Sequence, residues 1–225
     1  MAWHPSGKWL VISDDSALFS LSLETGEKRR LTSPADKIDF DRDPAISPSG
    51  EVLVFVRCSR KDSWGDLHLL ELSERVEAKG EPRRITFERG YTREPAWMPH
   101  GRAIIFSSGP DHNPSLFEIL LSRPGWRPTK PRRLGFAGHG ARMPAISRQG
   151  RLAYSAYTID ANIWRLELND VGQRSQPPTK PIIASTRLDH DQQYLRMATA
   201  LHSAQIGRAA WRSGCATATV LEPSS

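Results

Sequence analysis

One motif occurs four times along this chain and limits the possible folds more than any other feature. Its copies read MAWHPSGKWLVIS from Met1, PAISPSGEVLVFVR from Pro44, PAWMPHGRAIIFSS from Pro95 and PAISRQGRLAYSA from Pro144. The turn glycines of these copies, Gly7, Gly50, Gly101 and Gly150, lie 43, 51 and 49 residues apart. A period of about 40 to 50 residues is typical of arrays in which each repeat is one small β-sheet.

Each copy predicts a set of strands. After the glycine turn comes a compact apolar run such as VLVFV at 52–56, as expected of a strand buried on both faces. A second run, such as DLHLLEL at 66–72, alternates polar and apolar side chains, which is typical of a strand with one packed face. Basic segments (KRRLT, PRRIT and PRRLG) close the first three units, and positive charge on an outermost strand discourages pairing between molecules. We therefore predict an all-β fold, a β-propeller of four-stranded blades.

These units resemble the TolB-like, WD-repeat-like β-propeller repeat family, whose pattern is roughly PxWSPDGxxIAFxS, then IYxxDLxxG, then RRLT. The residues that fall on this pattern, besides the four glycines, are Trp3, Pro5, Pro48, Trp97 and Pro99. The aspartate of the family's turn is replaced by Ser6, Ser49, His100 and Gln149, which weakens any role for that carboxylate. The resemblance implies blades at approximately 1–43, 44–94, 95–143 and 144–191, and it extends to about residue 194.

Both ends of the chain depart from the repeat. Met1 to Trp3 align with Pro95 to Trp97, so a blade is already under way at the first residue. After Tyr194 the next blade should open with SPDG, yet residues 195–225 read LRMATALHSAQIGRAAWRSGCATATVLEPSS. Because propellers close with about four to eight blades, we expect this chain of four in-frame blades to be a fragment of a larger propeller.

The genetic code offers an explanation for the C-terminal segment. Permitted codons for residues 195 onward, read one base earlier with a T restored in front, encode SPDGNRIAFSSDRSGSVEVWVCDSDGS, a well-formed blade of this family. Met197 and Trp211 have single codons, and their fixed third bases still supply a glycine and a glutamate of that string. We therefore expect residues 195–225 to be translated out of frame. The alternative is a C-terminal amphipathic helix, which the spacing of Leu195, Ala198, Leu201 and His202 permits.

No familiar catalytic motif is present in the sequence. It has no G-x-S-x-G elbow, P-loop, G-x-G-x-x-G turn or H-E-x-x-H pair. We predict no catalytic residue, no metal site and no cofactor. A metal site built from Asp111, His112, Asp189, His190 and Asp191 is conceivable because carboxylate and imidazole are suitable ligands. Their spacing matches no characteristic ligand pair, so we interpret them as polar loop residues.

Aromatic and histidine residues suggest where a partner binds. Three tryptophans lie at repeat positions and are predicted to pack within the blades: Trp3, Trp97 and Trp164. Three other residues lie in loops and are predicted to contact a partner: Trp64 in RKDSWGD, Trp126 in RPGWRPTKP and His139 in AGHGAR. Loops held by a rigid scaffold are common binding sites. We expect a protein or a small ligand to bind at one face of the propeller.

Charge and cysteine content narrow the function classes. The net charge of +6 is scattered over strand ends and turns, so we expect no nucleic-acid binding by this region. The sequence has neither a signal peptide nor an apolar stretch long enough to span a membrane. Cys58 and Cys215 lie far apart and form no disulfide framework, so cysteine usage leaves the compartment open.

We interpret the chain as a non-enzymatic binding or interaction module. Blades that end in a phrase such as IASTRLDHDQQY resemble the sensory half of bacterial regulators with a winged-helix DNA-binding domain, which implies a parent protein of that kind. Two alternatives remain: the gating propeller of a prolyl-oligopeptidase-like peptidase, and a TolB-like periplasmic scaffold. A winged-helix sequence upstream, a G-x-S-x-G segment downstream or a signal peptide upstream would distinguish them.

Overall fold

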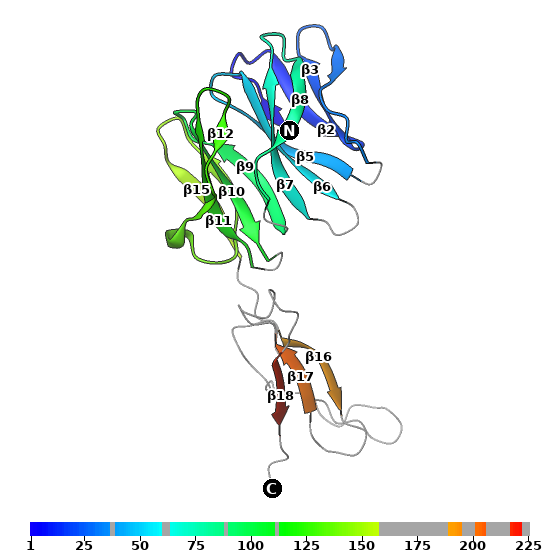
Figure 1. The fold of residues 1–225 in the computed structure, drawn as a ribbon, viewed down its shortest axis with the longest axis vertical. Helices are drawn as coiled ribbons and strands as arrows, with labels where there is room; N and C mark the ends of the chain where they lie inside the picture. Colours follow the sequence, from blue (N-terminus) through cyan, green and yellow to red (C-terminus); the bar gives the residue numbers. More distant parts are fainter. Residues whose placement is uncertain are drawn as a thin grey trace. The chain divides into compact units, whose positions relative to one another are not determined.

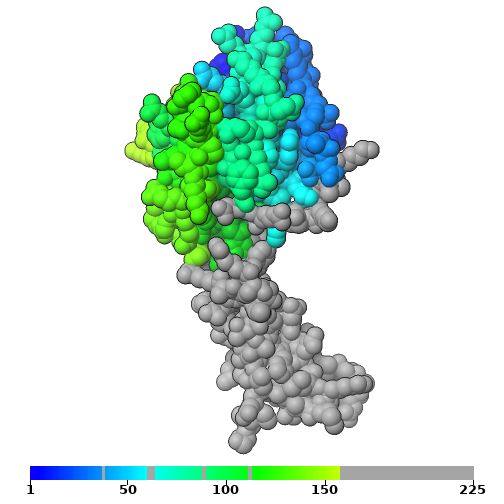
Figure 2. All heavy atoms as spheres, in the orientation of Figure 1, coloured from blue at the N-terminus to red at the C-terminus, as the bar shows by residue number. Residues whose placement is uncertain are grey.

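The structure is a computed structural model that describes residues 1–36, 39–59, 64–87, 90–110, 113–157, 189–194, 201–205 and 217–221. The chain divides into two compact units, Met1–Tyr157 and Thr158–Ser225. In the first unit, antiparallel sheets follow one another in chain order (Figure 1). Figure 2 shows the surfaces of these sheets adjoining one another, from blue through cyan to green. The predicted all-β fold with four-stranded blades is confirmed.

The strands have the following bounds. Blade 1 contains β1 (Ala2–Trp3), β2 (Trp9–Asp14), β3 (Ala17–Ser22) and β4 (Lys28–Arg30). Blade 2 contains β5 (Asp39–Ile46), β6 (Val52–Ser59), β7 (Gly65–Leu72) and β8 (Ala78–Arg84). Blade 3 contains β9 (Tyr91–Trp97), β10 (Ala103–Gly109) and β11 (Ser115–Ser122), with β12 (Arg127–Pro128) and β13 (Arg132–Arg133) both paired to β11. A 3-10 turn, η1 (Gly135–Ala137), leads to β14 (Ala141–Ile146) and β15 (Leu152–Ala156) of blade 4.

The second unit contains a three-stranded sheet of β16 (Asp189–Tyr194), β17 (Leu201–Gln205) and β18 (Thr217–Leu221). Residues 201–205 are therefore a strand, and the alternative of a helix is wrong there. Translation out of frame stays a prediction. No helix among the described residues is long and apolar enough to cross a membrane.

The blade boundaries differ from those expected. The sheets begin at Ala2, Asp39, Tyr91 and Ala141, so the expected boundaries at 43/44, 94/95 and 143/144 cut through β5, β9 and β14. The reason is that the proline of each motif lies in the middle of a strand. The polar residues before that proline carry no apolar periodicity to mark where the strand begins.

The core lies between blades, because each central strand uses both faces. On β6, Val54 and Val56 belong to the cluster shared with blade 3, whereas Leu53 and Phe55 belong to the cluster shared with blade 1. All four side chains are fully buried. This alternation follows the two-residue period of a strand. A third cluster joins blade 3 to blade 4, so burial couples every neighbouring pair of described blades in the first unit.

A bulge in the first strand of blades 2, 3 and 4 forms a second link between blades. In β5, β9 and β14, two consecutive residues lie opposite a single residue of the second strand. The first residue of each bulge has a positive φ: 50° at Asp43, 57° at Glu94 and 53° at Met143. Asp43 Oδ2 accepts hydrogen bonds from Arg93 Nε at 2.6 Å and from the Glu94 amide at 3.2 Å. Glu94 Oε2 accepts from the Met143 amide at 2.7 Å. The bulge thus directs each carboxylate to the same position of the next blade. β16 shows the same register shift, between His190 and Gln193.

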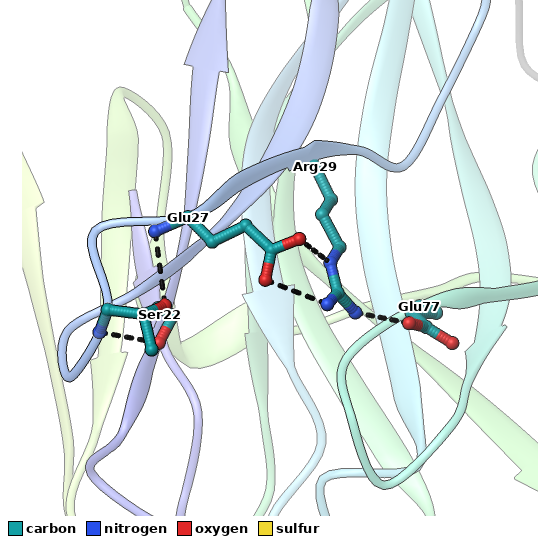
Figure 3. Close-up of polar contacts among 5 residues, drawn as sticks. Ser22, Glu27, Arg29 and Glu77 are labelled. Carbon is teal, nitrogen blue, oxygen red and sulfur yellow. Dashed lines mark hydrogen bonds and ion pairs between the residues drawn. The ribbon is translucent and has the colours of Figure 1, made fainter.

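The basic segments also connect blades. Arg29 of β4 binds Glu27 through Nε and Nη2 at 2.7 and 2.8 Å and reaches Glu77 of blade 2 through Nη1 (Figure 3). Arg83, at the same repeat position of blade 2, donates to the Trp126 carbonyl of blade 3 at 2.7 Å. In the basic segments of blades 1 and 2, the first of the two consecutive arginines therefore bonds to the following blade. This role goes beyond the predicted protection of sheet edges.

The turn glycines have the role that their spacing predicts. Gly7, Gly50, Gly101 and Gly150 have φ values of 72°, 80°, 68° and 78°, in the left-handed region that favours glycine. At Gly50 a Cβ atom would also lie 2.4 Å from His4 Nε2 of blade 1. That turn therefore requires glycine for its backbone conformation and for the close approach of two blades.

The repeat tryptophans do not all pack as predicted. Trp97 is 7% exposed, and its Nε1 donates to the Ala45 carbonyl of blade 2 at 3.1 Å. Trp3, at the same repeat position, is 60% exposed to solvent. In the part of the chain that the structure describes, the prediction that Trp3 packs within the blades is therefore wrong. The physical reason is that Trp97 packs on the blade before its own, and blade 1 has no earlier blade among the described residues. Trp164 lies outside the described residues.

This difference gives a paired prediction. Trp97→Phe should lower the free energy of unfolding by about 0.5 to 1.5 kcal/mol, because it removes the hydrogen bond from the indole to the half-buried Ala45 carbonyl. Trp3→Phe should change it by less than about 0.5 kcal/mol, as expected of an exposed position. Urea unfolding followed by circular dichroism measures both values. Equal effects of the two substitutions would contradict the assigned packing.

Candidate functional site

The topology places the predicted partner residues at two different ends of the blades. In an antiparallel blade, the loop between the second and third strands lies at the same end as the connection to the next blade, and we call this the crossover end. The other turns lie at the opposite end, the turn end. Trp64 and His139 belong to crossover-end loops, whereas Trp126 belongs to a turn-end loop. The three residues therefore do not form one site.

Blade 2 extends further than blade 1 at the crossover end. β6 and β7 have eight residues each, whereas β2 and β3 have six. The two extra residues of β6, Cys58 and Ser59, lie at the crossover end, where the Ser59 amide donates to the Trp64 carbonyl at 3.0 Å. A pocket of about 460 Å³ lies at this end, lined by Asp39, Arg57, Cys58, Ser59, Trp64, Asp66, His68 and Arg84. We call it the crossover pocket.

The strand register arranges charges of alternating sign beside this pocket. Asp41 of β5 lies opposite Arg57 of β6, which lies opposite Asp66 of β7. Arg57 Nε and Nη2 donate to the two carboxylate oxygens of Asp41 at 2.7 and 2.9 Å. The Asp41 side chain is completely buried. Its hydrogen bond raises the pKa of Arg57 above the ordinary value, so this guanidinium stays charged.

A second arginine and carboxylate pair completes the row. Arg84 Nη2 donates to Asp66 Oδ2 at 2.6 Å, and Arg84 Nε donates to the Thr86 carbonyl at 2.8 Å. Thr86 Oγ1 donates to Asp66 Oδ1 at 3.0 Å. Each of the two pocket arginines is thus already paired with a carboxylate. The positive charge of each guanidinium is therefore neutralised before a ligand binds.

His68 supplies a neutral acceptor to the pocket. Its ring stacks on Phe55 with the centroids 5.6 Å apart, and its Nδ1 lies 3.1 Å from the Asp66 carbonyl oxygen. Burial lowers the pKa of His68 to about 4, so the ring is uncharged at neutral pH. Because a carbonyl can only accept, the hydrogen bond assigns the proton to Nδ1 and leaves Nε2 as an acceptor.

Cys58, the other pocket residue of a potentially catalytic type, has a protonated thiol at neutral pH. Cys58 is 1% exposed, and burial raises the pKa of its thiol to about 11. A thiolate is the nucleophilic form of cysteine, and general acid–base catalysis is most efficient when the pKa lies near the working pH. Neither Cys58 nor His68 meets these conditions.

The depressed pKa of His68 predicts a pH dependence of stability. Unfolded histidine titrates near 6.5, so below that pH the unfolded chain binds a proton that the native chain does not bind until pH falls to about 4. Stability is therefore lost as pH falls from about 6.5 toward 4. A His68→Gln variant should lose less stability than the parent chain between pH 7 and pH 4.5. Urea titrations at both pH values test this, and an unchanged pH slope would show that His68 is not the group responsible.

Trp126 is engaged between blades. Its ring packs against the cluster between blades 2 and 3 and lies edge-on to Trp97, with centroids 6.1 Å apart. The Arg123 guanidinium lies 4.3 Å from the Trp126 ring centroid, and Arg123 Nη2 pairs with Glu51 of blade 2 at 2.6 Å. Trp126 also lines a second pocket, of about 540 Å³, together with Arg123 and Glu51. These contacts favour a packing role for Trp126 over the predicted contact with a partner.

His139 lies beside Arg133, whose Nη2 is 3.2 Å from His139 Nε2. Binding of a partner by His139 stays a prediction. Among the described residues, no group of three or more histidine, cysteine or acidic side chains is placed to hold a metal ion. Asp111 and His112 lie outside the described residues. Asp189, His190 and Asp191 lie in β16, where only the backbone is described.

Comparison with known proteins supports the fold. No protein-family model and no curated protein sequence matches the chain. A structure of TolB from Acinetobacter baumannii is 19% identical with a TM-score of 0.55, and the match covers 98% of this chain and 50% of that one. A protein assigned as TolB in Agrobacterium tumefaciens is 17% identical with a TM-score of 0.52, covering 92% of this chain and 69% of that one. Prolyl oligopeptidase B from Galerina marginata is 12% identical with a TM-score of 0.50, covering 90% of this chain and 30% of that one. The fold is therefore a β-propeller similar to that of TolB.

Proposed function

We propose that this chain is a non-enzymatic binding module, the sensory or protein-interaction part of a larger bacterial regulator, and that it binds its ligand at the crossover end. The observation that carries the proposal is the crossover pocket, which combines an aromatic ring with paired charges on a rigid sheet. Pockets with aromatic lining and a few fixed polar groups are typical small-molecule sites. The pKa values of His68 and Cys58, both moved away from neutrality by burial, support binding over catalysis.

Thermal unfolding of the full chain tests the binding proposal. A ligand that binds the native state raises the midpoint by mass action. We expect some members of a panel of sugars, amino acids and short peptides to raise the melting temperature of the parent chain but not that of a Trp64→Ala variant. Turnover of peptide or ester substrates by the purified chain would contradict the non-enzymatic proposal.

The gating propeller of a peptidase is the second candidate, supported by the similarity to prolyl oligopeptidase B. The coding DNA on both flanks distinguishes the two candidates. A winged-helix sequence upstream is expected for the regulator. A G-x-S-x-G segment downstream in the restored frame would instead assign the chain to the peptidase, and an upstream signal peptide would favour a TolB-like scaffold.

We also propose that residues 195–225 are read out of frame and that β16 begins a fifth blade. The second part of this proposal is supported by the register shift of β16, which leaves Asp191 and Gln192 opposite one residue in the way that Asp43 and Pro44 are in β5. The first part rests on the codon argument. Sequencing the coding DNA across codon 194 tests this. The expected result is a run that encodes SPDGNRIAF when read one base earlier, and any other run would overturn it.

A further inference from the structure

We infer that the crossover pocket of blade 2 binds a neutral saccharide. This inference rests on the proposed binding function and goes further, since it names the ligand class. Three features of the pocket carry it: the pairing of its charges, the alternation of its donors and acceptors, and the indole of Trp64.

The pairing of charges disfavours anionic ligands. The groups lining the pocket include two guanidiniums, of Arg57 and Arg84, and two carboxylates, of Asp39 and Asp66. Arg57 is held by Asp41 from behind, and Arg84 is held by Asp66. Each guanidinium is already neutralised by a carboxylate in a charge-assisted hydrogen bond, so an anionic ligand would also meet the repulsion of that carboxylate. A neutral ligand avoids this cost.

The remaining hydrogen-bonding capacity suits hydroxyl groups. Guanidinium groups only donate, whereas carboxylates and the His68 Nε2 only accept. Donors and acceptors alternate across the row of Arg57, Asp66 and Arg84. A hydroxyl group donates one hydrogen bond and accepts others. Adjacent hydroxyls of one sugar ring can therefore bond to a donor and an acceptor side by side.

The aromatic wall suits the face of a sugar ring. Trp64 is half-buried and lines the pocket. The carbon–hydrogen face of a pyranose is apolar, and an aromatic ring offers it a flat apolar surface of large area. The pocket volume of about 460 Å³ lies within the range of about 300 to 1,000 Å³ of small-molecule sites, which accommodates a mono- or disaccharide.

Isothermal titration of the full chain with maltose, cellobiose and diacetylchitobiose tests the inference. We expect at least one of these neutral disaccharides to bind, and Trp64→Ala to weaken its binding by more than about tenfold, because the variant removes the stacking surface. The matched control is Trp3→Ala, which removes an exposed indole from another blade and should leave the affinity unchanged. Equal urea midpoints for the parent chain and the Trp64→Ala variant exclude unfolding as the cause.

A second variant tests the charge argument. Asp66→Asn keeps the size of the side chain but removes one negative charge from Arg84. We expect this variant to bind the neutral disaccharide more weakly and to bind glucuronate at least tenfold more tightly than the parent chain does. Preserved neutral binding without any gain for glucuronate would contradict the role assigned to the paired charges.

The outcomes separate this inference from the proposed function. If none of the neutral disaccharides binds, or if Trp64→Ala leaves their affinity unchanged, the saccharide inference is wrong. If a dipeptide binds the parent chain and is lost in Trp64→Ala, or if the parent chain binds glucuronate more tightly than every neutral disaccharide, the neutral-saccharide inference is equally wrong but the pocket remains a binding site. The proposed regulator context is judged separately, by the flanking DNA.

Discussion

Asp41→Ala is expected to lower the free energy of unfolding by about 3 to 5 kcal/mol, because it leaves the Arg57 guanidinium largely buried without its carboxylate. The Asp41 side chain is 0% exposed and that of Arg57 is 18% exposed, and two hydrogen bonds of 2.7 and 2.9 Å join them. The cost is mainly the uncompensated charge left behind. Urea unfolding of the parent chain and the variant measures it.

The chain offers a matched control with the same geometry at the surface. Arg29 binds Glu27 through the same two nitrogens at 2.7 and 2.8 Å, but those side chains are 32% and 50% exposed (Figure 3). Glu27→Ala should cost no more than about 1 kcal/mol, because water replaces the lost partner. If the two substitutions cost the same, burial does not determine the strength of the Asp41 pair.

Phe106→Ala should also cost about 3 to 5 kcal/mol. Phe106 is 2% exposed and belongs to the cluster between blades 2 and 3, where its ring lies 6.1 Å from that of Phe117. Removing the ring forfeits its transfer free energy and leaves a cavity between two sheets. Phe136→Ala provides the control, since Phe136 is 71% exposed and should change stability by less than about 0.5 kcal/mol. A cost below about 1 kcal/mol for Phe106→Ala would contradict its place in the core.

The fold could be predicted because its signals are local and repeated. A glycine turn followed by an apolar run marks the second strand of a blade, and in blade 2 the structure shows the run at 52–56 fully buried. The start of each first strand could not be predicted, since residues such as Asp41 and Asp43 read as a polar loop. Their carboxylates are satisfied by Arg57 and Arg93. The register of the sheet brings Arg57 to Asp41, and the packing of blade 3 on blade 2 brings Arg93 to Asp43.

The site was predicted only in part, for a related reason. Trp64 and Trp126 have similar local sequences, with glycine and charged neighbours, and both read as exposed loop aromatics. Each lines a pocket, but Trp126 also packs against the core cluster between blades 2 and 3, whereas the pocket of Trp64 lies at the crossover end. The pocket beside Trp64 forms because blade 2 extends past blade 1 at the crossover end, and no local motif encodes the relative lengths of two blades. The partners of Trp64 in the pocket, Arg57 and His68, lie on strands and gave no functional signal.

The central claim is that successive blades pack face to face through opposite sides of their strands, and a double-mutant cycle tests it most directly. Val54 and Phe106 belong to one cluster across blades 2 and 3, whereas Phe55, the neighbour of Val54, belongs to the cluster with blade 1. We expect the Val54→Ala and Phe106→Ala pair to show a coupling free energy of at least about 0.5 kcal/mol in urea unfolding, and the Phe55→Ala and Phe106→Ala pair to add within about 0.5 kcal/mol. Coupling for the second pair but not the first would contradict the blade arrangement.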